Sequence, residues 1–116
     1  MTQDCIFCKI AAGDIPATKV YEDDSVVAFR DLEPQAPVHI LIIPKEHMEN
    51  VAALSARDDG GKLAGHILKK AAQIAAAEHL TEGWRLVTNT GADGGQTVPH
   101  LHFHILGGRK MLWPPG

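Results

Sequence analysis

Apolar residues recur along the chain with two different periods, and each period predicts a different kind of secondary structure. Short runs rich in β-branched and aromatic residues predict strands. Apolar side chains three and four positions apart predict an amphipathic helix from Lys62 to Leu80. The expected strands are ATKVYED (17–23), SVVAFRD (25–31), VHILIIP (38–44), WRLVTN (84–89) and the run that begins at PHLHFH (99–104), and the expected short helices are CIFCKIAAG (5–13) and EHMENVAAL (46–54).

The order of these elements predicts an α+β fold. The strands follow one another with one long helix inserted, which is typical of a five-stranded antiparallel sheet with helices packed on one face. Both faces of VHILIIP are apolar, so we expect it to be a central strand. The 116 residues contain no repeat or linker, and we expect one domain over residues 1–116.

Charge and composition narrow the function classes. The net charge is −3, so the sequence indicates neither a nucleic-acid surface nor a basic membrane patch. The N-terminus lacks the basic and apolar regions of a signal peptide, and the longest apolar run is too short to span a bilayer. We therefore expect a cytoplasmic protein in which Cys5 and Cys8, the two cysteines, are reduced.

The motif PHLHFH carries the most unusual spacing in the chain. In a strand, alternate side chains point to the same face, so His100, His102 and His104 would share one face. Leu101, Phe103 and Ile105 would share the other face, which we expect in the core. The histidine face would then meet a metal ion, a phosphate or water.

A glycine-rich loop, NTGADGGQTV (89–98), leads directly into the histidine run. Its glycines allow sharp bends and close approach to a ligand, and successive backbone N–H groups can bind an anion. A neutral histidine can attack phosphorus, and a protonated one can donate a proton to a phosphate oxygen or a leaving group. The combination therefore predicts phosphate chemistry more strongly than either motif alone. We found no carboxylate cluster for Mg²⁺ beside it, and infer that catalysis needs no divalent cation.

Four stretches together resemble a known family. HLHFHIL, DLEPQAPVHILIIPKEH, NTGADGGQTVPHLHFHILGGR and the tail WPPG are similar to the Hint branch of the histidine triad family, the purine nucleoside phosphoramidases. The resemblance implies a homodimer with a sheet continuous across two subunits. It also implies hydrolysis at the α-phosphorus of a purine nucleotide containing AMP or GMP, through a covalent nucleotidyl-histidine intermediate, with release of a nucleoside monophosphate.

The resemblance also implies a role for each matching residue. His102 would be the nucleophile and His104 its phosphate-binding partner, while His100 and His39 would set the orientation and tautomer of the other rings. The remaining phosphate-binding residues would be Asn89, Gly95, Gln96 and Thr97. The nucleoside would contact Ile6, Phe7, Phe29, Asp31 and Leu32, with Asp31 binding the ribose hydroxyls. Trp113 would approach the leaving-group side in the dimer. Thr97 stands where this branch often has serine, and its methyl group stiffens the side chain.

Cys5 and Cys8 form a Cys-x-x-Cys pair, a spacing that suits one metal ion or a redox disulfide. The strand-to-helix setting of a thioredoxin-like redox pair is absent from the sequence pattern, and two packed, reduced thiols remain an alternative. A zinc site needs two further ligands, for which His47 and His100 are the candidates. Family members with this pair, and the related galactose-1-phosphate uridylyltransferases, resemble this arrangement, which implies a structural zinc ion with four closed positions.

Three other functions remain open at this point. Within the family, a dinucleoside polyphosphate hydrolase is the nearest alternative. A non-catalytic purine nucleotide-binding regulatory module would use the same residues without turnover. A metalloenzyme would use His100, His102 and His104 as three ligands.

Overall fold

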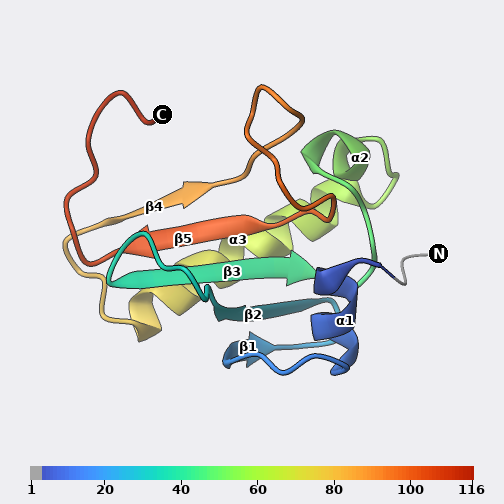
Figure 1. Cartoon of the computed structure of the whole chain (residues 1–116), viewed down its shortest axis with the longest axis horizontal. Helices are drawn as coiled ribbons and strands as arrows, with labels where there is room; N and C mark the ends of the chain where they lie inside the picture. The colour runs from blue at the N-terminus through green and yellow to red at the C-terminus, as the bar shows by residue number, and fades with distance from the viewer. Residues whose placement is uncertain (1–3) are drawn as a thin grey trace.

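Five strands and three helices make up the computed structural model, which describes residues 4–116 (Figure 1). The helices are α1 (Ile6–Ala12), α2 (Val51–Ser55) and α3 (Gly60–Ala77), and the strands are β1 (Lys19–Glu22), β2 (Val26–Arg30), β3 (Val38–Pro44), β4 (Trp84–Val87) and β5 (Phe103–Gly107). The strands form one sheet in the order β1-β2-β3-β5-β4, and each neighbouring pair is antiparallel. The predicted α+β fold with a five-stranded antiparallel sheet is confirmed.

Strand β3 lies at the centre of the sheet with the predicted bounds, and both of its faces are covered. Ile40 and Ile42 pack in the cluster that contains the apolar side of α3, whereas Leu41 and Ile43 pack with Phe7 of α1. The prediction that the helices share one face of the sheet is therefore wrong for α1. A strand that is apolar on both faces needs cover on each side, and α1 supplies it on the second face.

The helix boundaries differ from those predicted, and at α2 a local cap determines where the helix begins. Helix α2 begins after Asn50, whose side chain accepts a hydrogen bond from the backbone N–H of Ala53. The preceding residues, including His47, therefore lie in a loop rather than in the helix. Helix α3 begins at Gly60 and ends at Ala77, shortly before His79, whose positive φ of 61° does not continue a helix.

The histidine run enters the sheet later than predicted. Strand β5 begins at Phe103, so only His104 of the three motif histidines lies in a strand. His100 and His102 precede it in a segment where the N–H of Leu101 donates to the carbonyl of Met48. The predicted alternation nevertheless holds, because Leu101, Phe103 and Ile105 all belong to the core cluster on the α3 side.

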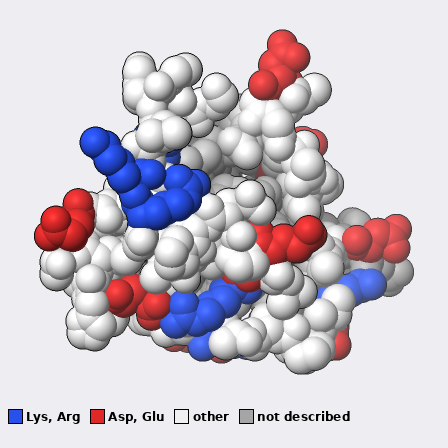
Figure 2. All heavy atoms as spheres, turned by 60° about the vertical axis from the view of Figure 1, so that its left-hand side comes forward, with Lys and Arg blue, Asp and Glu red and all other residues white. Residues whose placement is uncertain are grey.

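The structure also shows how charge is distributed on one face and how apolar the described helices are. Basic and acidic side chains are interspersed on the face shown in Figure 2. This face therefore lacks the single-sign basic stripe that binds a nucleic-acid backbone. Within residues 4–116, no helix combines the length and the apolar character that a membrane crossing requires.

Candidate active site and metal centre

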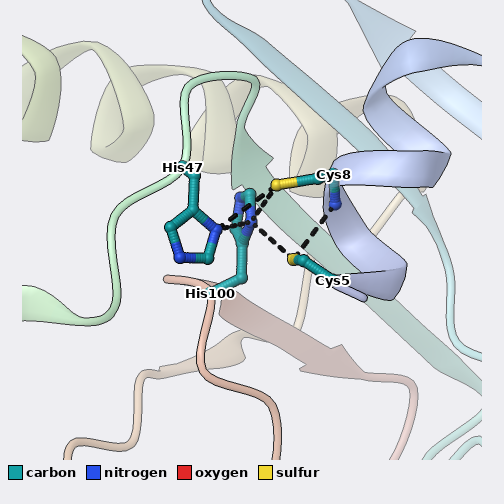
Figure 3. Close-up of side chains that lie close together, drawn as sticks. All are labelled: Cys5, Cys8, His47 and His100. Carbon is teal, nitrogen blue, oxygen red and sulfur yellow. Dashed lines mark hydrogen bonds between the residues drawn. The ribbon is translucent and has the colours of Figure 1, made fainter. Parts of the chain in front are cut away.

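Two cysteines and two histidines from three separate segments converge on one point beside α1 (Figure 3). The Nδ1 atom of His100 lies 3.2 Å from Cys5 Sγ, 3.4 Å from Cys8 Sγ and 3.2 Å from His47 Nδ1. Cys8 Sγ lies 3.3 Å from His47 Nδ1. Ligand atoms on a tetrahedral zinc ion, with Zn–S of about 2.3 Å and Zn–N of about 2.0–2.1 Å, are separated by roughly 3.3–3.8 Å. The four side chains therefore fit a Cys₂His₂ zinc site.

The local fold presents the correct atom of each ligand. Cys5 is the N-cap of α1 and accepts a hydrogen bond from the N–H of Cys8 at 3.3 Å, so the first helical turn places both thiols on the same side. His100 is fully buried, and its Nε2 donates to the carbonyl of Pro44 at 2.9 Å. That bond leaves the lone pair on Nδ1, which faces the cluster. Burial also lowers the pKa of His100 and so favours the neutral ring that a metal ligand requires.

His102 lies directly beside this centre and is 5% exposed. Its Nδ1 atom lies 2.7 Å from the carbonyl oxygen of His100. Because a carbonyl only accepts hydrogen bonds, Nδ1 carries the proton and Nε2 of the neutral ring holds the lone pair. The rings of Phe7 and His104 pack edge-on against it, each with a centroid separation of 5.0 Å. The arrangement leaves the neutral form of His102 with one oriented nitrogen that carries a lone pair.

His104 and His39 form a second pair on the same side of the sheet. His39 Nε2 lies 2.9 Å from His104 Nδ1 and 3.5 Å from Asp31 Oδ2. Burial lowers the pKa of His39, and the charge of Asp31 opposes that shift. The pKa of His104 is lowered to about 4, first by burial and then by His102 and His39. His104 is therefore neutral at pH 7.

Asp31, His39 and His104 also bring three potential ligand atoms within 4.8 Å of one another. The N–H of Gln35, however, donates to His39 Nδ1 at 3.0 Å, so the proton of the neutral ring sits on Nε2. A protonated Nε2 cannot bind a metal ion, and this group does not fit one. Among residues 4–116 the three motif histidines do not form a ligand group either, and the three-histidine metalloenzyme interpretation is wrong.

The glycine-rich loop is held by the side chain of Gln96. Its Oε1 accepts from the N–H of Gly91 at 3.1 Å, and its Nε2 donates to the carbonyls of Glu49 at 2.6 Å and Val98 at 3.0 Å. Gly91 and Gly95 have φ values of 74° and 78°, which favour glycine. The amide of Gln96, predicted to bind phosphate, is thus used to shape the loop. Of the other predicted phosphate-binding side chains, Asn89 is half-buried and Thr97 is exposed.

The predicted nucleoside-binding residues divide into two groups. Phe7 and Phe29 are buried and meet edge-to-face at 5.7 Å in the cluster under α1. Ile6 and Leu32 are surface residues, with exposures of 47% and 94%. Asp31 lies within reach of His39, as described above, and Trp113 lies in the exposed tail with 83% of its surface accessible.

Three contacts of the site were missed by sequence reasoning. Thr88 donates its hydroxyl to the carbonyl of His102 at 2.8 Å. Its position immediately before Asn89 was the available signal. Pro44 and Gln35 contribute only backbone groups, whose contacts cannot be predicted from the pattern of side chains.

Comparison with known proteins decides the family. The HIT domain matches residues 12–111. The chain belongs to the HIT family. It is 57% identical over 116 residues to an uncharacterized HIT-like protein of Synechococcus elongatus, with both chains covered completely. It is 49% identical over 113 residues to a 14 kDa zinc-binding protein of Brassica juncea, covering 97% of this chain and 100% of the relative.

A solved structure supports the same assignment. The HIT family hydrolase from Legionella pneumophila superposes with a TM-score of 0.92 at 54% identity, covering 97% of this chain and 99% of that one. The HIT family resemblance and the fold are thereby confirmed together. The similar structure from Legionella pneumophila is described as a hydrolase.

The low pKa of His104 predicts that this residue makes the HIT fold sensitive to acid. Between its ordinary value of 6.5 and about 4, the unfolded chain binds more protons at this residue than the folded one. Stability therefore falls as the pH falls through that window, by up to about 3 kcal/mol. Urea unfolding at pH 4.5–7 should show a weaker dependence for His104→Asn than for the wild type. His79→Asn, at an exposed histidine, serves as the control, and equal pH slopes for wild type and His104→Asn would contradict the prediction.

Proposed function

We propose that this chain hydrolyses nucleotide phosphoramidates or related substrates at the α-phosphorus and releases a purine nucleoside monophosphate. The observation that carries the proposal is the 2.7 Å contact from His102 Nδ1 to the carbonyl of His100. It orients the imidazole so that, in its neutral form, the Nε2 lone pair is available for attack. The adjacent glycine-rich loop and His104 supply hydrogen-bond donors for the phosphate oxygens. Membership of the HIT family and the hydrolase neighbour support the same class of reaction.

The reaction divides into two displacements. His102 Nε2 attacks phosphorus, the bond from phosphorus to the leaving group breaks, and the leaving amine takes up a proton from solvent. Water then attacks the nucleotidyl-histidine, releases the nucleoside monophosphate and returns the imidazole. A neutral His104 donates through Nε2, because its Nδ1 already faces His39. Backbone N–H groups of the loop stabilise the charge that develops on the oxygens.

Zinc has a structural role in this proposal. Cys5, Cys8, His47 and His100 would occupy all four positions and leave none for water or substrate. The bound ion would tie α1 to the loop after β3 and to the segment before β5. The zinc-binding name of the Brassica juncea relative supports this assignment. Catalysis itself is assigned to the histidines and needs no divalent cation.

We also propose that two subunits pair into a continuous sheet. Strand β4 is an edge strand that pairs only with β5 in the described part of the chain. Such an edge is a template for pairing with another strand. Apolar side chains nearby are exposed, with Trp84 at 37%, Leu112 at 73% and Trp113 at 83%. A second copy of the chain would cover these groups and the edge together.

Turnover of a substrate panel tests the proposed reaction. Adenylyl and guanylyl phosphoramidates, adenylates and dinucleoside polyphosphates would be supplied with and without EDTA, and released nucleotides would be quantified. We expect the phosphoramidates to be turned over fastest, with no added cation required. Preferential cleavage of dinucleoside polyphosphates would favour the other hydrolase class. Binding of purine monophosphates without turnover of any substrate would favour the regulatory module.

A further inference from the structure

A chain of three hydrogen bonds links the segment after β5 to His104. Arg109 Nε donates to the carbonyl of Gln35 at 3.0 Å, and the N–H of Gln35 donates to His39 Nδ1 at 3.0 Å. His39 Nε2 then meets His104 Nδ1 at 2.9 Å. In each of these three contacts a donor faces an acceptor. The series of hydrogen bonds therefore runs in one direction, from the guanidinium to the imidazole of His104.

The surroundings of His39 permit only one neutral tautomer. A backbone amide can only donate, so His39 Nδ1 must present its lone pair to Gln35. The proton is then on Nε2, where His104 Nδ1 and Asp31 Oδ2 are both available as acceptors. Because His104 Nδ1 accepts that proton, the neutral ring of His104 carries its own proton on Nε2.

The sheet register brings the two rings together but does not determine which nitrogen of each ring carries the proton. His104 is paired with Leu41 across β3 and β5, and His39 lies two residues before Leu41 on the same face. The rings consequently meet diagonally, with their centroids 5.2 Å apart. Sheet pairing alone would allow either tautomer. The donor that decides between them belongs to the loop between β2 and β3.

That loop is held by the segment that follows β5. Gly108 has a φ of 90°, and a Cβ at this position would lie 2.8 Å from Pro37 Cβ. The glycine therefore allows the two segments to touch directly. Arg109 adds a hydrogen bond to the Gln35 carbonyl, which lies in the peptide unit after the one whose N–H faces His39, and so holds Gln35 from its C-terminal side.

We propose that Gln35 and Arg109 are positioning residues for the reaction. The backbone N–H of Gln35, held by Arg109, sets the tautomer of His39 and thereby presents His104 Nε2–H to the substrate phosphate. The role of His104 as a phosphate donor rests on the proposed function. The tautomers themselves are a property of the protein without substrate. Neither residue touches the reacting atoms.

Histidine side-chain ¹H–¹⁵N correlation NMR on the zinc-loaded full chain measures the tautomers directly. We expect His39 and His104 both to be Nε2–H in the wild type. Gln35→Pro removes the N–H and keeps the carbonyl, and should give mixed tautomers at both rings, with a loss of kcat of about tenfold and little change in KM. Gln35→Ala keeps the N–H and loses only the side-chain bond to the Glu33 carbonyl, so it should match the wild type.

Several results would overturn the proposal. An Nδ1–H tautomer of either ring in the wild-type protein would overturn it. Wild-type tautomers in a folded Gln35→Pro variant would also overturn it. If Gln35→Pro does not unfold cooperatively, Arg109→Met is compared with Arg85→Met, whose arginine donates to the Leu112 carbonyl instead. We expect mixed tautomers only in Arg109→Met, and identical spectra in both variants would overturn the proposal. Since the spectra require no substrate, failure of the proposed reaction would leave this result intact.

Discussion

Replacing His102 with asparagine is expected to lower phosphoramidate turnover by more than about 1,000-fold while the fold remains intact. The asparagine amide can donate to the His100 carbonyl, as His102 Nδ1 does at 2.7 Å. It therefore keeps the local hydrogen bond and most of the packing against Phe7. What it removes is the nitrogen that we propose attacks phosphorus.

The measurement combines steady-state rates with nucleotide binding by calorimetry. Asparagine at His66, a histidine on α3 whose Nε2 lies 2.7 Å from Asp23 Oδ2, is the control for a histidine away from the site. We expect the His66 variant to keep its rate, and the His102 variant to bind purine monophosphate within a few-fold of the wild type. Rapid quenching of the wild type should trap a nucleotide on His102 by mass spectrometry. A His102→Asn rate within tenfold of the wild type would exclude the covalent mechanism.

Loss of the zinc ligands is expected to produce the largest change in stability. A ligand that binds only the folded state at a free concentration 1,000 times its Kd stabilises that state by about 4 kcal/mol. For a chain of this size we expect Cys5→Ser with Cys8→Ser to lower Tm by about 15 °C. Serine at position 5 can still cap α1, because its oxygen can accept from the Cys8 N–H as the Cys5 sulfur does. The loss therefore reports on the metal site rather than on the helix cap.

Elemental analysis and thermal unfolding test this prediction on protein purified without a metal-affinity tag. About one zinc ion per chain is expected for the wild type, by the four-ligand rule. His47→Ala should lose metal and stability, whereas His79→Asn, at an exposed histidine outside the cluster, should lose neither. Wild-type protein that contains no metal, and whose Tm does not respond to added zinc, would rule out the structural role.

The central parts of the fold were predictable because their physical signals are local and strong. The continuous apolar run of VHILIIP fixed the bounds of β3, and its two apolar faces required a central position. The wrong placement of α1 has the same origin. An apolar strand indicates that both faces are covered, but the pattern does not say which helix covers which face.

The candidate site was predictable where side chains define it. The Cys-x-x-Cys spacing, together with His47 and His100, led to the four residues that converge in the structure. The start of β5 was missed because the alternation of PHLHFH continues through non-strand backbone before Phe103. The donors and acceptors that orient the rings were missed as well. They are the carbonyls of Pro44 and His100 and the N–H of Gln35. The residue type does not indicate what a backbone group will contact.

His100 serves two centres through two chemically separate parts of one residue. Its imidazole is part of the Cys₂His₂ cluster, while its carbonyl oxygen accepts a hydrogen bond from the Nδ1–H of His102. A carbonyl is present whatever side chain stands at this position. The proposed zinc site therefore uses the side chain of His100, and the hydrogen bond to His102 uses its backbone. Replacing the four ligands with packed apolar residues would keep this backbone acceptor, which we propose orients the nucleophile.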